Sequence, residues 1–421
     1  MATRYWKGTA EAVAQITEAG INVFDAATTY GITIGDTTIS LLGDTDEETT
    51  TDALFALLNA STNVYFSGIT WDRNGATTTS TIRGTSDTAG LPFTFTTYAN
   101  GGTGSWNAVS DTTANSGPND WETAANWDGG VVPIAADDVV ITDNAINICW
   151  GLDQNAITLD SLTIKKSYTG RIGLDYKKFA TAADGATTTA SKIEYRENYL
   201  KISSTVVTIG EKSGIDTETG STRILLDTGS NASAITVQET AETSADAGRS
   251  AVRLLANHAS STIHVQDSLG GVGIAADDVG ETSLVSEIKF FGSNSSSQIN
   301  IGSGTTFTTY YQSAGTALMR AAATITTITM DGGVLNTYGD YTITTLTLND
   351  GTVNQANDKT GGDAVTTLNL VGGTFSTRNS GATRTIATAN ITAGVFVGNE
   401  GVTITTCNEP SGRYTMTTLA Q

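Results

Sequence analysis

The sequence is poor in cysteine, in long apolar runs and in charge. Only two cysteines, Cys149 and Cys407, occur in 421 residues, so we expect two reduced, buried thiols and neither a disulfide framework nor a metal site. No run of 18 apolar residues is present, and no apolar segment of a secretory signal follows Arg4 and Lys7. We therefore expect assembly in a cytoplasm and no membrane partner.

Positive charge is particularly scarce. Lysine and arginine together number 22, against 43 aspartates and glutamates, which gives a formal net charge of −21. A phosphate backbone needs many positive side chains, so nucleic acid is excluded as an expected partner. In place of charge the chain has threonine, serine, asparagine and 45 glycines. Threonine favours strands and glycine supplies corners with positive φ, so the composition predicts a mainly β protein with many tight turns.

We expect three segments along the chain. Residues 1–105 predict a small α+β domain, residues 106–154 a tryptophan-rich capping or linker segment, and residues 155–421 a right-handed parallel β-solenoid. The first segment contains short strand-like runs at 12–16, 30–34, 37–42 and 93–97. One helix lies among them, with Asp44 or Asp46 as its N-cap and with Leu54, Leu57 and Leu58 as its apolar stripe.

A coil repeat carries the solenoid prediction. Four segments share one pattern of alternating apolar residues followed by a glycine: Ile325 to Leu335, Ile343 to Val353, Val365 to Phe375 and Ile386 to Phe396. From Met330 to Leu348, Leu370 and Ile391 the steps are 18, 22 and 21 residues, in the range of one solenoid coil.

Each coil is expected to bury its apolar face against its neighbours. Leu346 and Leu348 point to the same side of a strand because one threonine separates them, and Gly351 provides the following corner. The outward positions then form a ladder of threonine and asparagine. The alternative architecture is a β-sandwich, in which strands recur every 8–12 residues or so.

Three tryptophans are the candidate ligand-contacting residues. Trp106, Trp121 and Trp127 lie within 22 residues of one another. They are interpreted either as aromatic caps over the open end of the solenoid or as a platform that contacts a glycan. The acidic loop at 239–248 is expected to lie on the surface.

A search for catalytic and cofactor motifs finds none. No phosphate-binding loop and no nucleophile elbow are present, and His258 and His264 are expected to be ordinary surface residues. Asp331 should lie close to Asn349 and Asp350 on the next coil, a spacing that sugar hydrolysis could use. Because Asp331 and Asp350 also fit the turn before a glycine, we predict no catalytic residue, no cofactor and no metal site.

Several stretches resemble virion-associated proteins of tailed bacteriophages and their prophages. The segments RYWKGTAEAVAQ, ALFALLNAST and SDTAGLPFTF are similar to an N-terminal module of such proteins. The segments NDWETAANWDGGVVPIAADDVVI, LDSLTIKKSYTGRIGL and EYRENYLKI are similar to their β-helical part. The resemblance implies a capsid-decorating or fibre protein and brings no catalytic residues with it.

The expected function is therefore that of a non-enzymatic structural protein on the virion surface. The expected partners are further copies of the chain, as a homotrimer, and other virion proteins such as the major capsid protein. Two alternatives stay open. One is a receptor-binding tail spike or fibre that recognises a host-surface glycan, and the other is a polysaccharide depolymerase.

Overall fold

The structure is a computed structural model that divides the chain into two compact units. It describes residues 2–63, 65–73, 80–174, 177–181, 190–195, 199–210, 218–246, 248–276, 280–293, 295–321, 324–338, 341–355, 364–377, 384–398 and 401–409. The first unit comprises Met1–Lys7, Trp127–Gly173 and Asn198–Gln421, and the second comprises Gly8–Asn126 and Leu174–Glu197. These limits differ from the expected boundaries after residues 105 and 154.

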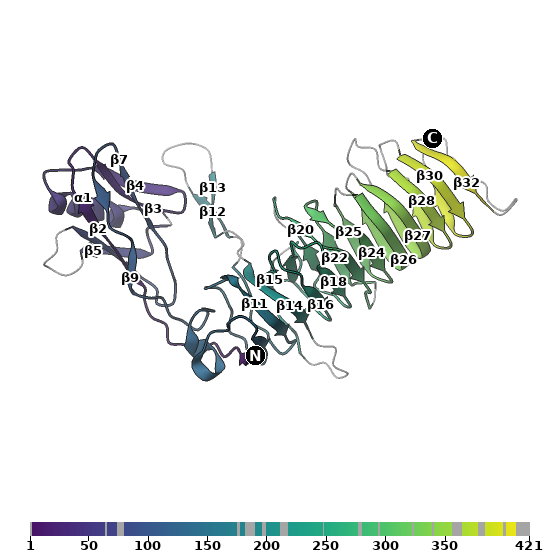
Figure 1. The fold of residues 1–421 in the computed structure, drawn as a ribbon, viewed down its shortest axis with the longest axis horizontal. Helices are drawn as coiled ribbons and strands as arrows, with labels where there is room; N and C mark the ends of the chain where they lie inside the picture. Colours follow the sequence, from purple (N-terminus) through teal and green to yellow (C-terminus); the bar gives the residue numbers. More distant parts are fainter. Residues whose placement is uncertain are drawn as a thin grey trace. The chain divides into compact units, whose positions relative to one another are not determined.

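The first unit is a parallel β-solenoid. It has about ten turns over residues 138–408, and the stacked strands follow one another from teal to yellow in Figure 1. Successive coils are joined by parallel pairs, from β10 with β11 to β30 with β32. The predicted mainly β fold with a parallel solenoid is confirmed. The β-sandwich alternative is wrong, because sandwich sheets are antiparallel.

Two long stacks of strands form the solenoid. One stack contains β10 (Asp138–Ile141), β11 (Asp153–Ile164), β14 (Leu200–Ile209), β16 (Ala234–Val237), β18 (Thr262–Val265), β21 (Glu287–Phe290), β24 (Thr309–Gln312), β28 (Ala364–Leu370), β30 (Arg384–Ile391) and β32 (Val402–Asn408). The other contains β15 (Ile224–Asp227), β17 (Val252–Leu255), β19 (Val272–Ile274), β22 (Gln298–Ile301), β25 (Thr316–Met319), β29 (Thr374–Ser376) and β31 (Val395–Val397). β26 (Thr324–Thr337) and β27 (Thr342–Gln355) run through both stacks, and β14 also reaches the second stack, where Leu200 and Lys201 pair with β15. β20 (Ser283–Leu284) pairs with β23 (Thr305–Thr306).

The apolar column predicted from the repeat is present in the core. Met330 pairs in register with Leu348, Leu348 with Leu370, and Leu370 with Ile391. All four side chains are buried. Each coil therefore covers the apolar face of its neighbour, and each backbone bonds to the coils on either side.

The glycine corners follow from the close approach of successive coils. Gly333, Gly351, Gly373 and Gly394 have φ values of 77°, 88°, 67° and 93°, a region that residues with a Cβ rarely adopt. A Cβ added to Gly351 would lie 2.6 Å from the carbonyl oxygen of Gly333 in the preceding coil. A glycine is therefore required at this corner both by its φ and by the space available.

The N-terminal strand completes the first coil. β1 (Thr3–Tyr5) pairs in parallel with β10, and Trp6 forms an antiparallel bridge with Trp127. The carboxylate of Asp137 accepts hydrogen bonds from the backbone of Ala2 and from Arg4 Nε, both at 3.0 Å. The short helix η3 (Asp128–Gly130) lies beside β1. The solenoid thus begins inside the expected capping segment and includes the first residues of the chain.

The second unit is a small α+β fold. Its strands are β2 (Ile16–Val23), β3 (Thr29–Ile34), β4 (Thr37–Leu42), β5 (Ile69–Arg73), β6 (Thr81–Ser86), β7 (Thr96–Asn100), β8 (Ser105–Trp106) and β9 (Ser110–Thr113), with the antiparallel hairpin β12 (Lys177–Thr181) and β13 (Ala190–Tyr195) and the short helix η2 (Ala124–Asn126). The helix α1 (Glu47–Ala60) packs on this core through Leu54 and Leu58.

The sequence predicted this unit with several local errors. Asp46 caps α1 as expected, but Leu57 is exposed, so the apolar stripe is narrower than predicted. The strand expected at 12–16 begins only at Ile16, and the strand expected at 93–97 begins at Thr96. The strands expected at 30–34 and 37–42 are present as β3 and β4.

Candidate functional site

The three candidate tryptophans are largely covered. Trp127 packs edge-on against Trp6, with ring centroids 5.1 Å apart, and closes the first coil of the solenoid. Trp127 and Trp121 are 1% and 0% exposed, so neither ring offers a face on which a sugar could stack. Trp106, in the second unit, is half-buried, and its indole nitrogen donates to the carbonyl oxygen of Tyr98 at 2.9 Å. A glycan contact at Trp106 stays a prediction.

The predicted proximity of Asp331 and Asp350 is present, but both carboxylates have structural partners. They pair in register on adjacent coils. Asp331 accepts hydrogen bonds from the Tyr311 hydroxyl at 2.9 Å and from Asn349 Nδ2 at 2.7 Å, and Asp350 accepts from the Gly351 backbone at 2.7 Å. Burial, together with the hydrogen bond to Asp331, raises the pKa of Tyr311. These bonds order the turn, and we assign no catalytic role to it.

The outer face of the C-terminal coils is a ladder of uncharged amides and hydroxyls. Asn354 donates to Asn336 at 3.0 Å, and Asn408 donates to Asn390, which donates to Asn369, at 2.8 Å in each case. Each side chain bonds to the equivalent residue of the next coil. The outer rows therefore add further links between coils and carry almost no charge.

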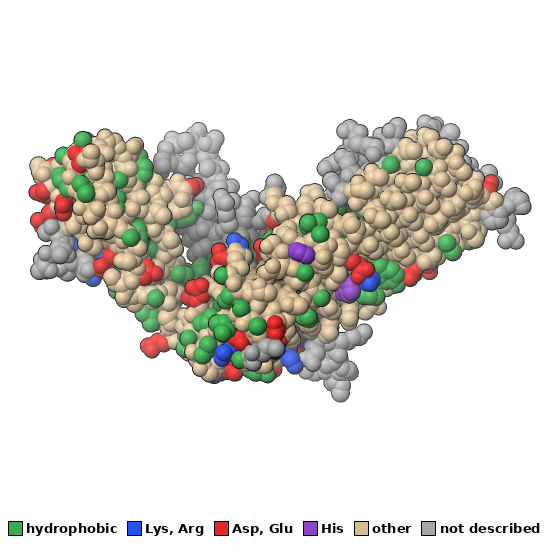
Figure 2. Space-filling model, in the orientation of Figure 1, with side chains coloured by type: hydrophobic (Ala, Val, Ile, Leu, Met, Phe, Trp, Pro, Cys, Tyr) green, Lys and Arg blue, Asp and Glu red, His purple; other side chains and the backbone are tan. Residues whose placement is uncertain are grey.

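At β18, β21 and β24 the outward positions carry charged and aromatic side chains in place of the ladder of asparagine and threonine. His264 points outward as predicted and lies 2.8 Å from Glu287, whose carboxylate also accepts from Lys289 at 2.8 Å. Phe291 and Tyr311 flank this group, with ring centroids 5.7 Å apart. In Figure 2, purple, red, blue and green side chains meet at one place on a solenoid face that is otherwise mostly tan. The sequence carried a signal for the two rings in the Phe290–Phe291 and Tyr310–Tyr311 doublets, in which one ring points inward.

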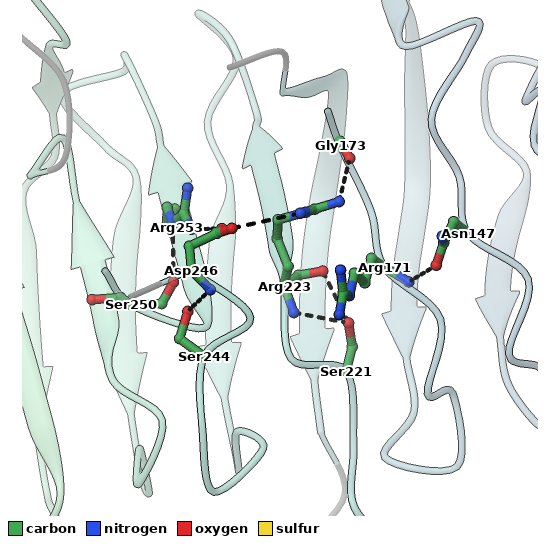
Figure 3. A network of polar contacts seen from close by, with 9 residues as sticks. All are labelled: Asn147, Arg171, Gly173, Ser221, Arg223, Ser244, Asp246, Ser250 and Arg253. Carbon is green, nitrogen blue, oxygen red and sulfur yellow. Dashed lines mark hydrogen bonds and ion pairs between the residues drawn. The ribbon is translucent and has the colours of Figure 1, made fainter. Parts of the chain in front are cut away.

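A buried arginine network lies on the other stack. Figure 3 shows Asp246 between Arg223 and Arg253, which are 4% and 1% exposed. Arg253 bonds to Asp246 through a terminal guanidinium nitrogen, and its Nε donates to the carbonyl oxygen of Ser250 at 3.0 Å. One guanidinium nitrogen of Arg223 lies 3.7 Å from Asp246, and the other donates to Gly173 at 3.4 Å.

The network holds a loop against the solenoid. Burial is the largest influence on Arg223 and lowers its pKa, the charge of Asp246 acts in the opposite direction, and Arg171 adds to the lowering. Asp246 belongs to the loop of residues 238–251 between β16 and β17. Because a buried cation needs a partner, the ion pairs of Asp246 with Arg223 and Arg253 hold this loop in a fixed position. The loop that was expected only to lie on the surface is therefore held against the solenoid through Asp246.

The end of this loop forms one wall of a polar groove. The groove has a volume of about 620 Å³. Arg249 and Ser250 line it on one side, and Gln298, Asn300 and Arg320 come from β22 and the end of β25. Further lining is provided by Gly248, Gly270, Gly271, Ala276 and Leu318. This groove was missed in the sequence, since it depends on the path of a loop with no repeat pattern.

The remaining candidate sites are metal ligands, membrane spans and free thiols. Within the described ranges, no three His, Cys, Asp or Glu side chains come together as metal ligands, and no helix there has the length and apolarity to span a membrane. Both cysteines are free thiols. The expectation that they are buried is wrong: Cys149 is half-buried, and Cys407, on the last described strand β32, is exposed.

The fold and its surfaces define a class, a parallel β-solenoid joined to a small α+β unit. No protein-family model, no curated protein and no solved structure matches this chain. The resemblance to bacteriophage virion proteins therefore stays a prediction.

Proposed function

We propose that this chain is a non-enzymatic structural protein on the surface of a bacteriophage particle, of the capsid-decorating or fibre type. The unbroken stack of parallel coils, with outer rows of bonded threonine and asparagine, carries the proposal. Such a stack resists local opening because each inner coil bonds along its length to two others. Few charges also leave few cleavage points for proteases that cut at lysine or arginine.

Location on the particle is tested by immunogold labelling. An antibody raised against the solenoid is applied to gradient-purified particles from a culture that expresses the chain. Labelling of intact particles is the expected result. Chain that sediments away from the particles, with no label on them, would contradict the proposal.

Docking to the particle is assigned to the second unit, and an internal deletion tests it. Because Trp6 bridges Trp127 and the Gly8 backbone donates to Asn126 at 3.4 Å, a short glycine link can replace residues 8–126 while β1 is retained. We expect this variant to keep a folded solenoid and to lose incorporation. Incorporation at the normal level would refute the docking role. Deletion of residues 1–126 is the matched comparison, in which the first coil should also fray.

Self-association as a homotrimer belongs to the same proposal, because closed symmetry is the usual mode of assembly for identical chains. Native mass spectrometry of the purified chain tests it. A trimer is expected, and a monomer at all concentrations would contradict it.

A further inference from the structure

We infer that one outer face of the C-terminal coils binds the surface of ice. The face consists of two rows of outward side chains on the stack from β24 to β32. The threonine row contains Thr309, Thr327, Thr345, Thr367, Thr388 and Thr406. The second row lies two residues further along each strand and contains Tyr311, Thr329, Thr347, Asn369, Asn390 and Asn408. In Figure 2 the surface over these strands is tan almost throughout.

The two rows form a regular two-dimensional array. Each member pairs in register with its equivalent on the next coil, with no shift at these positions, although the coils differ in length. Neighbours within a row are therefore about 4.8 Å apart, and the two rows are about 6.6 Å apart. The repeat along the stack is close to the repeat of oxygen atoms on the surface of hexagonal ice. A solid with this repeat can contact every coil at once, whereas a small molecule needs a concave site.

The hydroxyls of the threonine row are available to bind water. These side chains are half-buried, apart from Thr406, which is exposed. In the part of the chain that the structure describes, none of the six hydroxyls makes a hydrogen bond to protein. Threonine is β-branched and restricted at χ1, so its hydroxyl and methyl groups are held in place before any ligand arrives. The second row is ordered as well, because Asn390 donates to Asn369 at 2.8 Å and Asn369 donates to Thr347 at 3.3 Å.

The coil itself does not require threonine at these positions. The threonine row continues into the preceding coils, where Val206, Ala234 and Glu287 take the equivalent places. In the second row Lys289 precedes Tyr311. The same stack therefore accepts apolar, small and charged residues in both rows. The uncharged hydroxyls and amides from β24 onward are a property of this face and are not demanded by the fold.

The chemistry of the two rows suits ice better than a polysaccharide. Neither row contains a charged residue, although the chain has a net charge of −21. A charged group holds a hydration shell that does not fit the ice lattice, whereas a hydroxyl can take the place of a lattice water. Ligand sites for sugars are typically lined by aromatic side chains, and the two rows contain one ring, that of Tyr311 at their end.

Partition of the full chain into slowly grown ice tests the inference, because slow growth excludes dissolved protein that does not bind ice. We expect the wild type to be enriched in the ice relative to serum albumin and to separate the freezing temperature from the melting temperature. Thr345→Glu should lose most of both effects, because it interrupts the array with a charge that the same row accepts at Glu287. Thr352→Glu is the matched control. It places the same charge on the second stack of the same coil and should behave as the wild type.

Hydrogen exchange in β27 establishes that the variants are folded, and Thr367→Glu, one coil further, provides a second variant of the threonine row. Exclusion of the wild type from ice to the same extent as albumin overturns the inference. Equal losses in Thr345→Glu and Thr352→Glu overturn the assignment to this face. Sedimentation of the wild type with microcrystalline cellulose or chitin, but not with ice, would replace ice with a polysaccharide.

Self-association through the same face is the remaining alternative. An oligomer of the wild type that Thr345→Glu dissociates, measured by native mass spectrometry, would assign the face to a second copy of the chain and overturn the ice site. Immunogold labelling of particles does not depend on this face. The inference can therefore fail while the virion location holds, and the reverse is also true.

Discussion

Replacement of Gly351 by alanine probes the close approach of successive coils. At its φ of 88° an alanine costs about 1–2 kcal/mol. The new Cβ would also lie 2.6 Å from the oxygen and 2.7 Å from a backbone carbon of the preceding coil, at Gly333 and Gly332. Backbone must move to relieve these contacts, which adds about 1–3 kcal/mol. The expected loss of stability is therefore roughly 2–5 kcal/mol.

Two control variants separate the cost of the positive φ from the cost of the steric contacts. Gly280 has a φ of 95° but no atom of the described residues within 4 Å of an added Cβ, so Gly280→Ala should cost only about 1–2 kcal/mol. Gly68 has neither restriction, and Gly68→Ala should be neutral or stabilising by up to about 1 kcal/mol.

Hydrogen exchange followed by mass spectrometry is the appropriate assay, because each coil contacts only its neighbours and exchange reports the opening free energy of each coil separately. A loss of about 2 kcal/mol corresponds to roughly 30-fold faster exchange. Exchange should rise by at least this factor in β26, β27 and β28 and stay unchanged in β14 and β16. If Gly351→Ala exchanges no faster than Gly280→Ala, the coils do not approach each other as described.

Two further predictions concern charged groups. Asp246→Asn should destabilise the loop of residues 238–251 by about 3 kcal/mol, measured by local hydrogen exchange, because the buried Arg223 and Arg253 lose the carboxylate that they share. An effect no larger than that of Ser244→Ala would contradict this. Burial alone would raise the pKa of Asp137, but the Arg4 guanidinium and two backbone donors outweigh it and hold the pKa below its usual value. The ionised carboxylate therefore stabilises the fold above the unfolded-state pKa of about 3.9, and this contribution is lost as the pH falls through the lower folded-state pKa. The stability difference between wild type and Asp137→Asn, measured by thermal unfolding, should be constant above about pH 5 and shrink below pH 4 or so; a difference that grows on acidification would refute the assignment.

The solenoid was predictable where the sequence repeats. The alternation at Leu346 and Leu348 and the phase of Gly351 depend on backbone geometry that is the same in every coil, so the pattern was sufficient to align Met330, Leu348, Leu370 and Ile391. Helix α1 was predictable for a similar reason, because its cap and its buried leucines act within a few residues of one another.

Features that depend on contacts distant in sequence were not predictable. The three residues of β1 are too few to carry a pattern, and their partner β10 lies about 135 positions later. The groove depends on Asp246 contacting Arg253, seven residues later in the same coil, and Arg223 of the preceding coil, and no repeat pattern indicates these contacts. Burial of Trp121 and Trp127 likewise follows from tertiary packing, whereas the sequence showed only that the two tryptophans are close along the chain.

The pairing of β1 with β10 has a consequence for biosynthesis. The first strand leaves the ribosome about 135 residues before its partner, a delay on the order of ten seconds. During this time residues 8–126 can fold, which brings Gly8 next to Asn126 and hence Lys7 close to Trp127. The long loop is then closed before the solenoid starts, and the entropic cost of joining its ends has been met by the earlier folding step. Because residues 8–126 are synthesised and fold first, β1 is already near the position of β10 when the first coil of the solenoid forms.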